Sequence, residues 1–208
     1  WQLARELAGL GIEVAVLANQ DYVSVADALA FNVKQDFRVV RVPRSPAPAF
    51  TMAVRLALAL RLMRVFKPDV LLASGSGAVL AAAMLGACGA PPWVAVGHGS
   101  EFPTRGTLRD SLVRRAFSVA DAVVAVSAYT KKRMEMVGIT HSKTFVIHNG
   151  ADARLFQMLA ASEVRAAKQK LGLENERVIL TVGNVTKRKG QEVVIRAMPL
   201  ILQRVPNV

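Results

Sequence analysis

Residues 70–100 read VLLASGSGAVLAAAMLGACGAPPWVAVGHGS, and this stretch decides the fold. It contains no Asp, Glu, Lys or Arg. About 20 apolar residues suffice to cross a bilayer, but Gly75–Gly77 interrupts the stretch at one end and Pro91–Pro92 at the other. The uninterrupted part is too short for a membrane span. The segment therefore predicts a buried strand, a turn, a buried helix and a second buried strand.

The same alternation of short apolar runs and longer helical patterns extends in both directions along the chain. Runs of this kind, separated by helices, are the βαβ signature of a parallel sheet with helices on both faces. The predicted strands are Glu13–Ala18, Arg38–Val42, Asp69–Ala73, Trp93–Gly97, Ala122–Ser127, Thr144–His148 and Val178–Val182. The predicted helices are 2–9, 49–66, 77–88, 107–119, 129–137, 161–171 and 191–204. The fold class is α/β.

Length and composition indicate a globular protein of one large domain, or of one domain and part of a second. The chain has 208 residues, of which 52% are hydrophobic and 20% charged, which excludes a disordered or collagen-like protein. A polar helical pattern after Asn149–Gly150 predicts a domain boundary, giving domains 1–157 and 158–208. The single cysteine, Cys88, excludes an internal disulfide and a cysteine-rich zinc site, and favours a reducing compartment, the cytoplasm.

The charge of the chain predicts an anionic partner. Lys and Arg number 27 against 15 Asp and Glu, a net charge of +12, and residues 101–208 carry 18 of the cations against 9 of the carboxylates. Nucleic acid, a membrane surface and a phosphorylated small molecule are all consistent with such a balance. Composition alone does not choose among them.

Three candidate site residues lie at or just after the ends of predicted strands, where ligands bind in open parallel sheets. His98 lies between two glycines directly after an apolar strand, although a lone histidine is also common as a structural residue. Glu101 can orient the imidazole or bind a hydroxyl, or it is a solvated loop carboxylate. Ser127 begins a helix, where it is a natural N-cap and where anions bind; we interpret Lys131, Lys132 and Arg133 as a solvated face.

Residues 181–190, TVGNVTKRKG, form the most informative stretch for function. A buried strand ends at Gly183, three cations follow, and a helix begins after Gly190. Backbone N–H groups, the helix dipole and ammonium groups would converge there on a phosphate-bearing ligand; the alternative is a solvated basic loop. The sequence has no Asp-X-Asp motif to hold a divalent metal against a diphosphate, so fixed cations would have to neutralise it.

Two further glycine motifs are interpreted as turns. Ser74-Gly75-Ser76-Gly77 stands where a dinucleotide-binding loop would lie, but Leu80 replaces the third glycine, so a tight strand-to-helix turn is favoured. Asn149-Gly150, in VIHNGAD, predicts a turn with positive φ.

Taken together, HGSE at 98–101, VSAYT at 126–130, VIHNGAD at 146–152 with Phe156, and TVGNVTKRKGQEVVIRAMP at 181–199 resemble the family-4 retaining glycosyltransferases of GT-B fold. The resemblance covers most of the chain in order and spacing. It implies two Rossmann-like domains facing a cleft, the first mainly binding the acceptor and the second mainly the nucleotide-sugar. The chain would then hold nearly all of the first domain, without its first strand, and the start of the second.

The resemblance also implies roles for single residues. His98 matches the cleft histidine near the transferred sugar and is the candidate catalytic residue, and Lys189 matches the lysine that contacts the donor diphosphate. Asn184 stands where the family often has arginine, so one expected cation is lost there; either Lys187 or Arg188 replaces it, or neither does. The expected donor contacts are Gly183, Asn184, Lys189, Glu101, Ser127 and Asn149. No cofactor, metal or nucleic acid is expected.

Two family features are absent, the glycine-rich loop after the first strand and the paired glutamates of the donor domain. We therefore expect residues 1–208 alone to transfer no sugar. A nucleotide-sugar epimerase of the same fold is an alternative. Another is a peripheral membrane or polyanion-binding module, based on the helix Thr51–Lys67 with its four cations. A lipid-linked acceptor at the inner face of the membrane would reconcile this last alternative with the enzyme.

Overall fold

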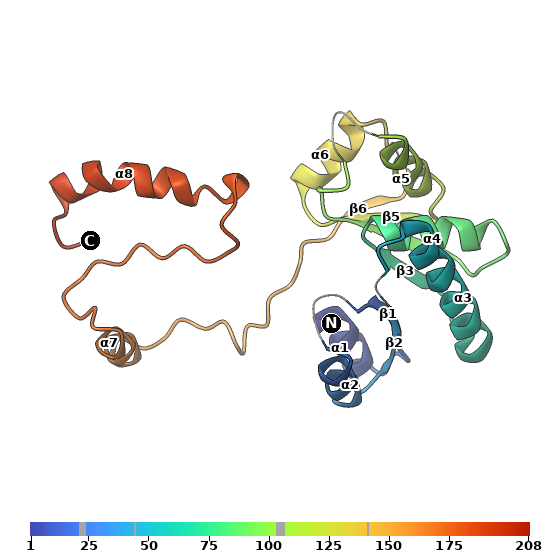
Figure 1. Ribbon diagram of the computed structural model, residues 1–208, viewed down its shortest axis with the longest axis horizontal. Helices are drawn as coiled ribbons and strands as arrows, with labels where there is room; N and C mark the ends of the chain where they lie inside the picture. The colour runs from blue at the N-terminus through green and yellow to red at the C-terminus, as the bar shows by residue number, and fades with distance from the viewer. Residues whose placement is uncertain (21–23, 44, 103–106, 141) are drawn as a thin grey trace. The chain divides into compact units, whose positions relative to one another are not determined.

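The computed structural model describes residues 1–20, 24–43, 45–102, 107–140 and 142–208. It divides into two compact units, Trp1–Asn149 and Gly150–Val208 (Figure 1). The division by contacts lies between Asn149 and Gly150, whereas the sequence predicted a boundary at 157–158.

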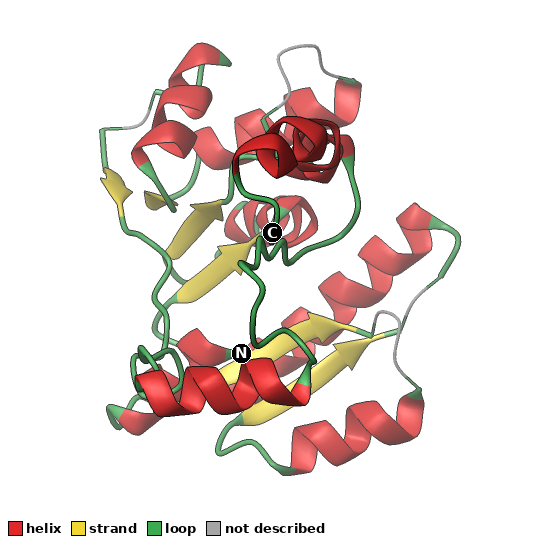
Figure 2. Cartoon of the chain, turned by 90° about the vertical axis from the view of Figure 1, so that its left-hand side faces the viewer, coloured by secondary structure: helices red, strands yellow, loops and turns green. Residues whose placement is uncertain are grey.

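The first unit is built on parallel strands. The two-stranded sheet pairs β1 (Ala15–Asn19) with β2 (Arg38–Val42), and the four-stranded sheet follows the order β3-β4-β5-β6. The strands of this second sheet are β3 (Leu71–Ser74), β4 (Trp93–Gly97), β5 (Ala122–Ala125) and β6 (Thr144–Val146). Every pairing is parallel (Figure 2), which confirms the predicted α/β class.

Helices connect these strands, as parallel pairing requires. The first helix, α1 (Gln2–Gly9), precedes β1, and the connecting helices are α2 (Val25–Val33), α3 (Pro48–Phe66), α4 (Ser76–Gly86), α5 (Leu108–Ser118) and α6 (Ala128–Met136). The sequence predicted all of them except α2. The signal for α2 is its cap: the Oγ of Ser24 accepts a hydrogen bond from the N–H of Asp27 at 3.0 Å.

Residues 70–100 contribute much of the hydrophobic core of the first unit. Val79 on α4, Ala95 on β4 and Val123 on β5 are fully buried, and Phe102 and Phe117 meet edge to face with ring centroids 5.0 Å apart. Helix α4 packs on β3 and β4 and against α5, while α6 packs on β5 and β6. Over the described part of the chain, no helix combines the length and the apolar character that crossing a membrane requires.

Helix α3 is half packed and half exposed. It contacts β1, β2 and α4. The opposite face exposes apolar and cationic side chains together: Phe50, Leu60, Arg61, Arg64 and Val65.

The second unit contains α7 (Ala161–Lys170), the short 3₁₀ turn η1 (Lys187–Lys189) and α8 (Gln191–Arg204). The predicted strand Val178–Val182 is wrong: the segment pairs with no other strand, and Val182 is 83% exposed. A strand needs a neighbour to satisfy its backbone groups, and residues 150–208 contain no strand. The prediction of a positive-φ turn at Asn149-Gly150 is also wrong, because the chain leaves β6 in an irregular course and neither residue has a positive φ.

Candidate functional site

The candidate site of the first unit lies where the parallel strands end. Because all strands of a sheet run the same way, their carboxyl ends share one edge. Ser74 ends β3, His98 follows β4, and Ser127 follows β5 by two residues. The fold therefore gathers at one edge polar residues that are widely separated in the sequence.

His98 is held at two points, one on its ring and one on its backbone. Its ring Nε2 lies 2.8 Å from the Oγ of Ser74, within hydrogen-bonding distance. Its backbone N–H donates to the Oε2 of Glu101 at 3.1 Å. Glu101 is 9% exposed. The Glu101 carboxylate thus contacts the peptide of His98, whereas Ser74 contacts the imidazole.

The loop that carries His98 packs tightly against its surroundings. A Cβ on Gly97 would lie 3.0 Å from the ring of Phe102, and one on Gly99, whose φ is 98°, would lie 3.3 Å from the Oγ1 of Thr130. The positive φ favours glycine at position 99, and a side chain at position 97 would require the ring of Phe102 to shift. The path of the loop is fixed by close contact with the core and with the first turn of α6.

Arg133 secures the far end of the same loop. Its Nη2 donates to the backbone carbonyl of Phe102 at 2.6 Å, and the side chain is half-buried. The sequence interpretation of Arg133 as part of a solvated face is therefore wrong. The interpretation failed because the contact joins residues 31 positions apart, and only the packing of α6 beside the loop brings them together.

Ser127 caps α6. Its Oγ accepts a hydrogen bond from the N–H of Thr130 at 3.0 Å and lies 3.0 Å from the hydroxyl of Thr130, which is buried. These contacts account for a serine at this position. A donor-binding role for Ser127 stays a prediction.

Arg55 is a further cation at the ends of β1 and β3 that was not predicted as part of the site. From α3 it donates through Nη2 to the Oδ1 of Asn19, the last residue of β1, at 2.8 Å. Its guanidinium also lies close to Gly77 in the first turn of α4. The signal available in the sequence was an arginine within an apolar helix, but its partners depend on the fold.

The basic loop of the second unit brings three predicted residues together. The aliphatic stem of Lys189 runs beside Gly183: a Cβ on that glycine would lie 3.8 Å from the Cε of Lys189. The backbone carbonyl of Asn184 accepts a hydrogen bond from the side-chain amide of Gln191 at 3.0 Å. The loop closes through Gly190, which has a φ of 73° and precedes α8. Lys189 is exposed, and the side chain of Arg188 lies outside what the structure describes.

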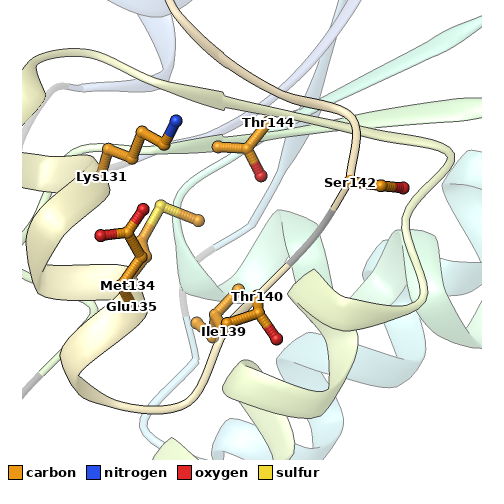
Figure 3. Close-up of a pocket in the computed structure, with 7 residues that line it drawn as sticks. All are labelled: Lys131, Met134, Glu135, Ile139, Thr140, Ser142 and Thr144. Atoms are coloured by element: carbon orange, nitrogen blue, oxygen red, sulfur yellow. The ribbon is translucent and has the colours of Figure 1, made fainter.

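A pocket of about 310 Å³ in the first unit lies between α6 and the start of β6 (Figure 3). Several of its lining residues precede β6, so it opens at the amino end of that strand, opposite the end that His98 occupies. The lining comprises Lys131, Met134, Glu135, Ile139, Thr140, Ser142 and Thr144. It includes none of the predicted site residues. Among the residues with described positions, no three His, Cys, Asp or Glu side chains are grouped as metal ligands would be.

The sequence of this chain matches a known protein family. The family model described as Glycosyltransferase Family 4 matches residues 1–155. A GDP-mannose-dependent monoacylated alpha-(1-6)-phosphatidylinositol monomannoside mannosyltransferase of Corynebacterium glutamicum is 27% identical over 185 residues, which are 87% of this chain and 48% of that protein. The chain therefore spans about half the length of this relative.

Solved structures share the fold. Sucrose-phosphate synthase from Thermosynechococcus elongatus superposes with a TM-score of 0.77 at 18% identity, over 96% of this chain and 53% of that one. The HepE protein of Anabaena in complex with UDP-glucose gives 0.71 at 20% identity, over 88% and 49%. These likenesses confirm the predicted GT-B fold.

Proposed function

Because the chain belongs to glycosyltransferase family 4, we propose that the protein moves a sugar from a nucleotide-diphosphate-sugar to an acceptor hydroxyl with retention of anomeric configuration. The observation that supports this best is the family match over 1–155 together with the ordered His98 at the carboxyl edge of the four-stranded sheet. The mannosyltransferase relative supports the donor class, since its name specifies GDP-mannose. The motifs that resembled this family led to the same assignment.

The proposed role of His98 is to contact the sugar being transferred. Its ring is exposed and held by the contact with Ser74. The imidazole can therefore hydrogen-bond a hydroxyl of the transferred sugar without first being immobilised. Glu101 supports it by holding the peptide that carries the ring.

The proposed role of the basic loop is to neutralise the leaving diphosphate. Negative charge grows on the diphosphate as the glycosidic bond breaks, and a fixed ammonium nearby stabilises that charge more in the transition state than in the bound donor. Lys189 has an exposed ammonium on a stem that lies along Gly183. We propose that such fixed cations perform this task without a metal ion, and that Gly183 and Asn184 border the donor.

The exposed face of α3 supports a membrane-linked acceptor as a second element of the proposal. Phe50 is 59% and Val65 61% exposed, and Arg61 and Arg64 lie on the same face. Apolar side chains that insert between lipids, together with cations that attract anionic headgroups, characterise interfacial helices. We propose a lipid-linked acceptor and peripheral attachment to the inner face of the cytoplasmic membrane.

Transfer from radiolabelled GDP-mannose and UDP-glucose to a membrane lipid extract tests this function, using the protein at its natural length. Label entering the lipid phase with the anomeric configuration of the donor, in the presence of EDTA, is the expected result. An inverted product would contradict retention, and activity that EDTA abolishes and Mg²⁺ restores would contradict catalysis by fixed cations. The absence of both transfer and donor binding would contradict the function itself.

A further inference from the structure

We propose that Ser74 is a positioning residue for His98: it fixes the imidazole plane by engaging Nε2, so that Nδ1 is presented to the transferred sugar. The proposal rests on the proposed function, which gives His98 its role at the sugar. Its basis in the structure is the 2.8 Å separation between the Oγ of Ser74 and Nε2.

The backbones of the two residues are fixed independently of their side chains. Strands β3 and β4 are paired neighbours, with Ser74 opposite Val96, two residues before His98. After Ser74 the chain turns through Gly75, at a φ of 84°, into α4, while after β4 the carboxylate of Glu101 holds the N–H of His98. The hydroxyl and the ring therefore meet across rigid elements.

An exposed histidine ring without a partner would rotate among its rotamers. The serine hydroxyl both donates and accepts, so it can engage Nε2 whichever tautomer is present. The described residues form no hydrogen bond with Nδ1. Nδ1 is therefore the ring nitrogen that remains for a ligand, and the hydroxyl of Ser74 determines which of the two nitrogens has that role.

The direct test is a nuclear magnetic resonance measurement of the ring nitrogens in the 208-residue chain. The chain has three histidines, so ¹⁵N-histidine labelling gives few signals, and His98→Gln identifies those of His98. We expect Ser74→Ala to move both ring-nitrogen shifts of His98, whereas Ser74→Thr, which keeps a hydroxyl, retains the wild-type pattern. Ser76→Ala, which removes the next hydroxyl in the same turn, is the matched control and leaves the pattern unchanged. Far-UV circular dichroism verifies that each variant is folded.

The functional test uses the protein at its natural length with the sugar donor that it turns over. Loss of a neutral hydrogen bond predicts that Ser74→Ala lowers kcat roughly threefold to tenfold and leaves the donor KM within about twofold, with Ser74→Thr restoring most of the rate. Unchanged His98 ring signals in Ser74→Ala, or an unchanged kcat in an active enzyme, would overturn the positioning role. If the wild-type protein neither transferred sugar nor bound a donor while Ser74→Ala still moved the ring signals, the proposed function would be contradicted and the hydrogen bond would be confirmed.

Discussion

The guanidinium of Arg55 lies against Gly77, so that a Cβ built on the glycine would be 2.9 Å from Nη1. The same guanidinium donates to Asn19 at 2.8 Å, and it thereby links the end of β1 to the start of α4. Glycine at position 77 thus leaves room for an arginine contributed by another helix. This relationship has a measurable consequence for stability.

A double-mutant cycle measures how strongly Arg55 and Gly77 are coupled in the free energy of unfolding. Alanine favours a helix over glycine by up to about 1 kcal/mol, but in Gly77→Ala the arginine must move and weaken a hydrogen bond worth about 1 kcal/mol. We expect Gly77→Ala alone to change the free energy of unfolding little, and to stabilise the Arg55→Ala protein by roughly 0.5–1 kcal/mol. Urea denaturation provides the four values. Strict additivity would show that the two residues do not interact.

Replacing Lys189 tests the donor site. A charge-assisted bond from its ammonium to the diphosphate predicts that Lys189→Ala lowers kcat/KM about tenfold to a hundredfold, with part of the loss in kcat. Lys187→Ala is the matched control, because Lys187 lies in the same 3₁₀ turn and is also exposed. Steady-state kinetics with and without Mg²⁺ measure the effect, and added Mg²⁺ should not rescue the variant. Equal losses in the two variants would mean that only diffuse positive charge matters.

Reversing charge on α3 tests membrane attachment. Each cation near an anionic surface contributes about 1 kcal/mol to membrane binding. Arg61→Glu with Arg64→Glu should therefore lower the partition coefficient for phosphatidylserine-containing vesicles, measured by sedimentation, by at least about 30-fold. The fold should be unaffected, because both side chains are exposed. Arg109→Glu with Arg115→Glu, two exposed positions on α5, makes the same change in net charge elsewhere. A similar loss with this control pair would contradict a dedicated surface on α3.

The pH dependence of stability should include a contribution from the first turn of α5. Hydrogen bonds from the backbone N–H and then the hydroxyl of Thr107, with the charges of Arg109 and Arg114 adding less, hold the pKa of Asp110 below its ordinary value of 3.8. A carboxyl with a lowered pKa stabilises the fold above its unfolded-state pKa, and this stabilisation is lost as the pH falls through the folded-state pKa. Denaturation of wild type and Asp110→Asn between pH 7 and 3 should therefore show a difference that shrinks below about pH 4. A constant difference would contradict this role.

Local pattern was sufficient to predict the elements that the structure contains between residues 70 and 100, because apolar runs and glycine turns determine them directly. Helix α2 was missed because its few polar residues give no clear helical period, although Ser24 and Asp27 form a recognisable cap. The strand at 178–182 was predicted from composition alone, but pairing depends on a neighbour that residues 150–208 do not provide.

The candidate site was only partly predictable for a related reason. His98 and Glu101 lie three residues apart and follow one strand, so the sequence could propose that they interact. Ser74 and Arg133 meet the His98 loop only through the order of the strands and the packing of α6, which a single sequence does not display.

The fastening of residues 97–102 to α6 has a thermodynamic consequence. The hydroxyl of Thr130 leaves little room beside Gly99 and Arg133 binds the carbonyl of Phe102, so folding alone has already restricted the torsional freedom of the loop. Under the proposed function, a sugar that binds at His98 need not supply that ordering free energy, so ordering of this loop adds little to the entropic cost of binding. A substitution at Thr130 or Arg133 that weakens these contacts would leave the loop to be ordered when the sugar binds. Calorimetry would then record a less favourable binding entropy with the direct contacts to the sugar unchanged.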